Sequence, residues 1–359
     1  MTQPAALGMP GGLGRPRAAR PVGPDPLAGL LELAGVSAAV DAARTACEEL
    51  RWHEGFRRRW REVRAEADLR AARGSAAVDG ARVPLTAVRR LAVGSPVDGP
   101  DLGLVAGALR ATVLAGRWRP DLGASSGPPV PPLGELLARL HTATMRDLLP
   151  AADLGRLRGT DQPRDLSGLG PAPTGALLAQ RIALLTRTLA ETRAPAMVTA
   201  AVLHGEVLAL RPFVAGNGVV ARAAARLVLA VRGLDPTGAV VAEGGWAQSP
   251  NMYLSAAAGF ATGSPAGVGG WVAFCARSVV AGAAVGREVA DAVLVGRLGE
   301  SPVGDGFASP GGEVSVGDGL PETSRGDASV DDRAERPDGV GLPVPGGDVP
   351  SADTDDDAR

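Results

Sequence analysis

The segment RPFVAGNG, residues 211–218, is where the residue types and their spacing point most directly to chemistry. It lies between two apolar stretches that have the composition of helices. Pro212 fixes its own φ, and Gly216 and Gly218 allow left-handed or closely approached backbone on either side of Asn217. The helix that follows then begins with N–H groups that have no acceptor within that helix, and such a helix N-terminus favours an anion.

Two arginines flank this loop. Arg211 begins it, and Arg222 lies four residues after Gly218, about one turn into the following helix. A charge-assisted hydrogen bond from an arginine to an anion is worth about 1.5–3 kcal/mol. A Gly-Asn-Gly turn alone is commonly structural, so the arginines are what favours a site. The sequence therefore predicts a pocket for a phosphate or carboxylate.

The segment from Leu203 to Pro236, LHGEVLALRPFVAGNGVVARAAARLVLAVRGLDP, resembles the signature region of the Fic (Fido) family. The family motif reads HPFx[DE]GNGRxxR, and a helix with Leu-His lies before it, as His204 does here, seven residues before Arg211. The residues that match the motif are Pro212, Phe213, Gly216, Asn217, Gly218 and Arg222. The flanking segments ELLARLHTATMRDLL and MYLSAAAGFATGSPAGVGGWVAFCARSVV also resemble the family, so the likeness covers residues 130–290.

This resemblance implies a helical fold and the transfer of AMP from ATP to a hydroxyl group of a protein side chain. In the family the motif histidine is the general base, the acidic residue holds Mg²⁺, the GNG backbone cradles the phosphates, and both arginines contact them. Carried over to this chain, it predicts that a nucleotide or another anion is bound by Arg211, Phe213, Gly216, Asn217, Gly218 and Arg222.

Three motif positions differ here, and all three belong to the chemistry. Arg211 stands in place of the histidine, Ala215 in place of the metal-binding acid and Val219 in place of the first arginine. The pKa of arginine is above about 12, so Arg211 cannot accept a proton near pH 7. Loss of general-base catalysis alone costs about 10²–10⁴ in rate. Ala215 offers Mg²⁺ no side-chain oxygen. His204 lies two turns back on the preceding helix, and we expect structural or surface roles for His53 and His141.

A shorter likeness lies at residues 75–80, SAAVDG, which resembles the SxxxEG motif of the inhibitory helix that precedes the Fic domain in one class of the family. It would assign an inhibitory role to Ser75, Asp79 and Gly80. If that helix docks as in the family, Asp79 is a candidate partner for the arginines of the loop. A helix end with Asp-Gly as its turn explains the same residues, and the sequence leaves both interpretations open.

These observations favour a catalytically impaired, regulatory pseudoenzyme that requires no cofactor and binds ATP or another phosphate without Mg²⁺. The alternative is an active nucleotidyl- or phosphoryl-type transferase of altered chemistry, in which Arg211 stabilises a phosphate and another group supplies the base. A third function, nucleic-acid binding, is suggested by 33 basic against 24 acidic side chains in residues 1–299. It is less favoured because the helix with the arginines of residues 51–64 also carries Glu54, Glu62, Glu66 and Asp68. A protein partner and a homodimer stay open.

The elements expected to position the loop are all helices, because no alternating run of strand-forming residues is long enough to predict a sheet. Between Val40 and Arg73 a single helical run would place Trp52, Phe56 and Trp60 four residues apart, which predicts an apolar face in the core and a solvated face of arginines. The fold class is therefore all-α: an N-terminal helical module at residues 27–125 and a Fic-type helical bundle at 126–298, with helices predicted over 133–149, 176–192, 196–210, 219–232, 249–261 and 268–292.

The composition supports this division of the chain. Its 359 residues are 45% hydrophobic and 21% charged, which suits a globular protein and excludes fibrous and membrane classes. The 50 glycines and 30 prolines predict disorder in residues 1–26 and in an acidic tail, 299–359. Cys47 and Cys275 are too few for a disulfide framework or a zinc ribbon. Because no apolar run like that of a signal peptide occurs, we expect a cytoplasmic protein without a membrane partner.

Overall fold

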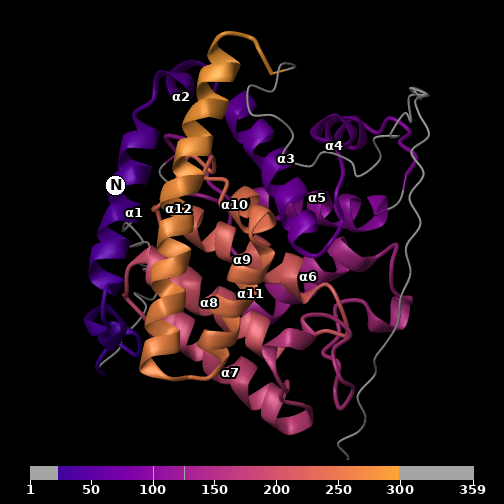
Figure 1. Cartoon of the computed structure of the whole chain (residues 1–359), viewed down its shortest axis with the longest axis vertical. Helices are drawn as coiled ribbons and strands as arrows, with labels where there is room; N and C mark the ends of the chain where they lie inside the picture. Colours follow the sequence, from indigo (N-terminus) through magenta and orange to yellow (C-terminus); the bar gives the residue numbers. More distant parts are fainter. Residues whose placement is uncertain (1–22, 100, 125, 299–359) are drawn as a thin grey trace, which may run out of the picture. The chain divides into compact units, whose positions relative to one another are not determined.

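Twelve α-helices and three short 3₁₀ helices form the part of the chain that the structure, a computed structural model, describes: residues 23–99, 101–124 and 126–298 (Figure 1). No strand occurs in these residues, so the prediction of an all-α fold is confirmed. The two segments predicted to be disordered lie outside the described residues, except for residues 23–26.

Two central helices carry the loop of interest between them. α8 (Ala196–Leu210) and α9 (Asn217–Val231) pack against each other, and both are buried along most of their length. α6 (Leu133–Met145) covers α9, while α7 (Gly175–Glu191), α11 (Pro250–Ala261) and α12 (Pro265–Leu294) cover α8. A helix surrounded in this way must be apolar on all sides, as the sequence of α8 is.

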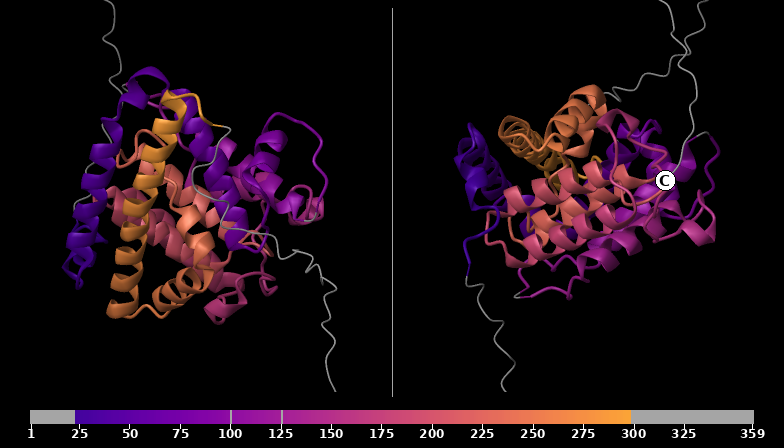
Figure 2. Two further views of the ribbon diagram at one scale, coloured as in Figure 1. Left: turned by 45° about the horizontal axis from the view of Figure 1, so that its top comes forward. Right: turned by 90° about the horizontal axis from the view of Figure 1, so that it is seen from below.

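The N-terminal helices share this core. α1 (Val36–Arg51) lies along α12, as the views agree (Figure 1, Figure 2), and α3 (Trp60–Val78) packs on α9 and on the short α10 (Glu243–Gln248). The remaining elements are α2 (Glu54–Arg58), α4 (Leu85–Ala92), α5 (Leu102–Gly116) and the 3₁₀ helices Ala28–Glu32, Ala151–Asp153 and Ser167–Leu169. The division near residue 126 therefore stays a prediction.

The predicted single helix from Val40 to Arg73 is wrong, because the chain breaks twice within it. His53 has extended backbone, and its Nδ1 accepts a hydrogen bond from the N–H of Gly55, which starts a new helix in a new direction. Of the three aromatic residues only Phe56 is fully buried, whereas Trp52 is 67% exposed. The expected aromatic core face does not form.

Arg64 also departs from the predicted solvated face. Its side chain is buried and donates hydrogen bonds to the carbonyl oxygens of Thr237, Pro236 and Pro120. The other arginines of α2 and the start of α3 are exposed or pair with nearby carboxylates, as Arg58 does with Glu54. The prediction therefore fails where tertiary contacts, which the sequence pattern does not reveal, replace water.

α3 approaches α10 closely enough to require a glycine. A Cβ at Gly74 would lie 2.7 Å from the backbone carbonyl carbon of Glu243, well inside van der Waals contact. Gly74 directly precedes Ser75, and α3 ends at Val78 with Asp79 as its C-cap. This close contact therefore fixes where the end of α3, with Ser75 and Asp79, meets the rest of the fold.

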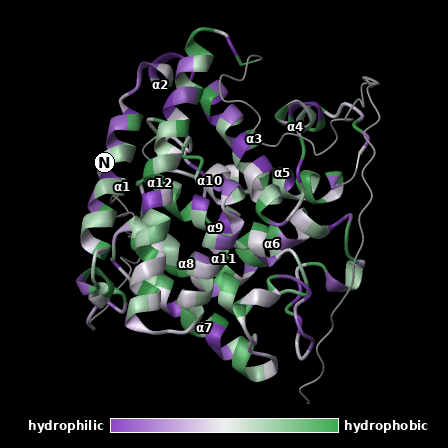
Figure 3. Cartoon of the chain, viewed as in Figure 1, coloured by the Kyte–Doolittle hydropathy of each residue, from purple (hydrophilic) through white to green (hydrophobic). Residues whose placement is uncertain are grey.

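α12 is the one helix in the described residues that is long and apolar enough to cross a membrane. Half of its most apolar 18-residue window is buried inside the fold, where it packs on α1, α8, α10 and α11. Hydrophobic residues run along α8 as well as α12 (Figure 3). Burial in the core accounts for the apolar sequence of α8 and for the buried half of that window in α12.

Candidate functional site

The loop between α8 and α9 is a sharp turn built on two residues with left-handed backbone. Arg211 ends α8 at a φ of 43°, and Gly216 precedes α9 at a φ of 79°. A Cβ at Gly216 would lie 2.6 Å from the sulfur of Met145 on α6, so both the conformation and the space require glycine. α9 begins at Asn217, two residues before the predicted start.

Asn217 closes this turn with its side chain. Its Oδ1 accepts a hydrogen bond from the N–H of Phe213, and its Nδ2 donates to the carbonyl oxygen of Phe213, each at 2.9 Å. Both residues are fully buried. Two of the predicted binding residues, Phe213 and Asn217, therefore shape the loop in this structure.

Arg222 meets the predicted inhibitory motif. Its Nη2 lies 2.8 Å from Asp79 Oδ2, its Nε donates to Ser75 Oγ at 2.8 Å, and Nη2 donates to the carbonyl oxygen of Ser75 at 2.9 Å. The Asp79 carboxylate also rests on Gly218, where a Cβ would lie 2.8 Å from Asp79 Oδ1. Burial, the largest single cause, lowers the pKa of Arg222, but the charges of Asp79 and Tyr253 and the hydrogen bonds to them together outweigh it and hold the pKa above its usual value. The structure thus brings together Ser75, Asp79, Gly218 and Arg222.

Arg211 points to a different partner. Its Nη1 donates to the carbonyl oxygen of Leu166 at 2.9 Å and its Nη2 to that of Gly170 at 2.6 Å, and its side chain is fully buried. The two arginines that the sequence places on one anion therefore serve two different segments, α3 and the loop of residues 158–170.

A second carboxylate, Asp165, reaches the start of α9. Its Oδ2 accepts from the backbone N–H of Asn217 and its Oδ1 from Asn217 Nδ2, both at 2.8 Å. Burial raises the pKa of Asp165, although both hydrogen bonds from Asn217 oppose the shift. The sequence does not reveal a role for Asp165, because an aspartate in a glycine- and proline-rich interval belongs to no motif.

Tyr253 and His204 form the inner side of the Arg222 environment. The Tyr253 hydroxyl accepts from Arg222 Nη1 at 3.4 Å and lies 2.7 Å from His204 Nε2. Burial, with Arg222 as the second cause, lowers the pKa of His204 well below its usual value, so the imidazole is neutral. His204 is thus a structural residue here. The sequence does not reveal that Tyr253 contacts Arg222 and His204.

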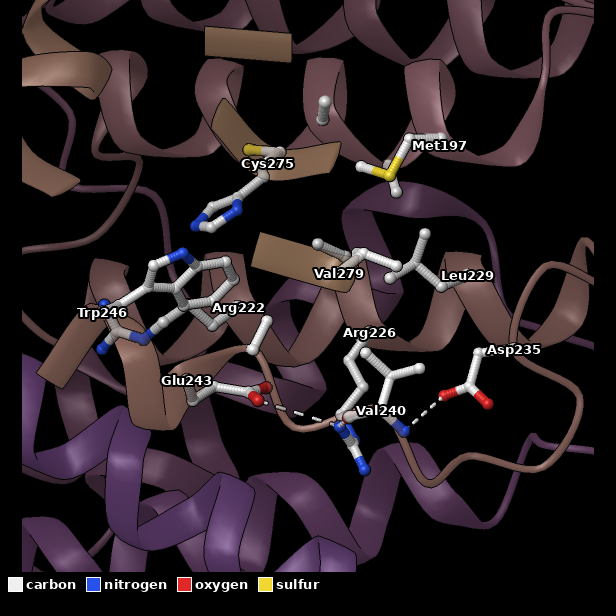
Figure 4. Close-up of a pocket in the computed structure, with 15 residues that line it drawn as sticks. Met197, Arg222, Arg226, Leu229, Asp235, Val240, Glu243, Trp246, Cys275 and Val279 are labelled. Atoms are coloured by element: carbon white, nitrogen blue, oxygen red, sulfur yellow. Dashed lines mark hydrogen bonds and ion pairs between the residues drawn. The ribbon is translucent and has the colours of Figure 1, made fainter. Parts of the chain in front are cut away.

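A cavity of about 30 Å³ lies beside this cluster (Figure 4). Arg222 and Trp246 line one side, and Arg226 and Glu243 another, with Nη1 of Arg226 3.8 Å from Oε2 of Glu243. That volume holds a water molecule or two and no nucleotide. The described residues also contain no cluster of three metal-ligating side chains.

His141 on α6 supports the loop from the opposite side. Its Nδ1 accepts from the N–H of Gly155 at 2.9 Å, so Nε2 carries the proton and donates to the carbonyl oxygen of Ala215 at 3.1 Å. The ring stacks on Phe213 with 4.0 Å between centroids. Burial lowers the pKa of His141 to about 4, which keeps it neutral near pH 7.

Residues 133–229, which span α6 to α9 and contain this loop, match the sequence model of the Fic/DOC family. The chain contains a Fic domain. The loop RPFVAGNG and Arg222 lie within the matched residues, while Ser75 and Asp79 on α3 precede them. A comparison with curated proteins gave no match.

Solved Fic structures share the fold. A Fic family protein from Desulfovibrio desulfuricans G20 is 19% identical over 72% of this chain and 74% of its own, with a TM-score of 0.55. Fic-1 from C. elegans is 16% identical over 73% of each chain, also at 0.55. A Fic domain containing signaling protein from Bacteroides thetaiotaomicron VPI-5482 is 13% identical over 70% of this chain and 98% of its own, at 0.54.

We predict that the Fic domain loses stability in acid through His141. The unfolded histidine has a pKa near 6.5 and the folded one about 4, so in this window the unfolded state binds the extra proton and stability falls as the pH falls. Urea unfolding at pH 7 and pH 4.5 measures this loss. Wild type should lose about 2 kcal/mol more than His141→Gln between the two pH values. An equal loss in both proteins would contradict a buried, neutral His141.

Proposed function

We propose that this chain is a catalytically impaired Fic protein that acts as a regulatory module. In this proposal it binds a nucleotide or another phosphate without a metal, acts in the cytoplasm, and is held closed by its own α3. The observation that supports it most directly is the ion pair between Asp79 and Arg222, placed against Gly218 at the start of α9.

The absence of AMP transfer rests on the groups that surround the loop. Arg211 occupies the base position, and its guanidinium already donates to two carbonyl oxygens, so it cannot take a proton from an attacking hydroxyl. His141 and His204 are neutral, but each is fully buried and hydrogen-bonded to other residues of the fold. Neither histidine is therefore placed to act as a general base, a role worth about 10²–10⁴ in rate.

The residues at the family's metal position do not fit Mg²⁺. Ala215 has a methyl group where an oxygen ligand is needed, and its carbonyl oxygen accepts a hydrogen bond from His141. The two carboxylates near the loop, Asp79 and Asp165, are bonded to Arg222 and Asn217. No step of the proposed function therefore passes through a metal ion.

A phosphate, in contrast, fits the donors at the start of α9. The guanidinium of Arg222 and the first N–H groups of the helix would bind it, and the helix dipole favours a negative charge there by about 0.3–1 kcal/mol. Asp79 now satisfies Arg222, so a ligand must displace this carboxylate. Binding and the release of α3 are then coupled, which is what a regulatory module requires.

We predict no AMP transfer, either to the chain itself or to lysate proteins, when the purified protein is incubated with labelled ATP and Mg²⁺. The same result is expected for Asp79→Ala, because opening the site does not supply a base. Arg222→Ala serves as the control variant. Metal-dependent labelling that disappears in Arg222→Ala would establish the alternative, an active transferase of altered chemistry.

We also predict that Asp79→Ala binds ADP at least tenfold more tightly than wild type when metal is absent, because the variant frees the Arg222 guanidinium. Calorimetry with ATP, ADP and AMP measures this difference. Asp41→Ala, which removes an exposed carboxylate of α1, is the matched control and should bind as wild type does. Equal affinity of wild type and Asp79→Ala would contradict closure by Asp79.

A further inference from the structure

The loop of residues 158–170 runs beside the motif loop of the Fic domain. The N–H of Arg158 donates to the carbonyl oxygen of Pro212 at 3.0 Å, and the N–H of Arg164 donates to that of Val214 at 2.7 Å. These two backbone hydrogen bonds, whose donors are six residues apart, join the two loops at two points. The second donor directly precedes Asp165, so these bonds help to place Asp165 at the start of α9.

Two buried arginines hold this loop in place. Arg158 Nε donates to the carbonyl oxygen of Arg211 at 2.6 Å, and Arg211 in turn donates to those of Leu166 and Gly170. Leu166 has a φ of 54°, a conformation that a leucine adopts only when its surroundings impose it. This strained residue directly follows Asp165, and Arg211 donates a hydrogen bond to its carbonyl oxygen. Arg211 therefore helps to hold the backbone beside Asp165.

Asp165 places a negative charge on the donors that would meet a phosphate. It accepts hydrogen bonds from the backbone N–H and from the side-chain Nδ2 of Asn217. Asp79 forms an ion pair with Arg222 and lies against Gly218. The first turn of α9 therefore faces two carboxylates from two separate segments. A ligand that displaced Asp79 alone would still meet Asp165.

We infer that Asp165 is a second built-in anion that closes the phosphate cradle, and that Arg211, at the position of the lost general base, is the positioning residue that holds it there. This inference rests on the proposed function, since it concerns the same anion site. It reverses the role that the sequence suggests for Arg211: the residue excludes a phosphate and does not bind one.

Calorimetry with ADP in the absence of metal tests this inference on four proteins: wild type, Asp79→Ala, Asp165→Asn and Asp79→Ala/Asp165→Asn. Asparagine keeps the shape and an acceptor oxygen of Asp165 while removing the charge. Asp161→Asn in the Asp79→Ala background is the matched control, because Asp161 is an exposed residue of the same loop. We expect the double variant to bind ADP at least tenfold more tightly than Asp79→Ala, and the control to change nothing.

Arg211→His and Arg211→Ala, each in the Asp79→Ala background, test the positioning role. Both should raise ADP affinity severalfold and speed hydrogen exchange of the Arg164 and Asn217 amides at least tenfold. The indole N–H of Trp271, which donates to the carbonyl oxygen of Ala201, reports whether the fold is intact. In both variants its hydrogen-exchange rate should equal that of wild type. Weaker ADP binding in both variants with an intact fold would show that Arg211 binds the phosphate, and would overturn the inference.

The two proposals fail differently. If Asp79→Ala and the double variant bind ADP equally well, the second closure is wrong while the proposed function stands. If none of the four proteins binds ADP, ATP or AMP, the anion site itself is absent and both proposals are overturned.

Discussion

The buried guanidinium of Arg222 is the constraint on which the rest of the site depends. A charge this deeply buried is costly unless a carboxylate and further hydrogen bonds satisfy it. Asp79 supplies the charge and Ser75 two acceptors, and both come from α3. α3 can deliver them only because Gly74 lets it approach the backbone of α10. The N-terminal helices are therefore part of the site, although they precede the matched family residues.

The three motif positions at which this chain differs from the family, Arg211, Ala215 and Val219, all make structural contacts. Arg211 secures the loop of residues 158–170, the carbonyl oxygen of Ala215 receives a hydrogen bond from His141, and Val219 is buried in the core. Arg211 contributes through its side chain, Ala215 through its backbone alone and Val219 through burial of its side chain. All three positions therefore contribute to the packing of the loop and of the helix that follows it.

The sequence predicts those parts of the structure that follow from local rules. The positions of α8 and α9, the glycines of the turn and the contact between SAAVDG and Arg222 could be anticipated from spacing and resemblance. The sequence could not predict the direction of the Arg211 side chain or the position of Asp165 at the start of α9, because the loop of residues 158–170, which is distant in the sequence, determines both. The break at His53, which exposes Trp52, was missed for a related reason: a capping hydrogen bond outweighed the helical periodicity.

Closure of the site by α3 requires that Asp79 and Arg222 interact strongly in the folded protein, and a double-mutant cycle on urea unfolding measures this interaction. It compares wild type, Asp79→Ala, Arg222→Ala and the double variant in the absence of ligand. We predict a coupling free energy of about 2 kcal/mol, because the two groups form a largely buried ion pair. A coupling free energy near zero would show that α3 does not close the site through this pair.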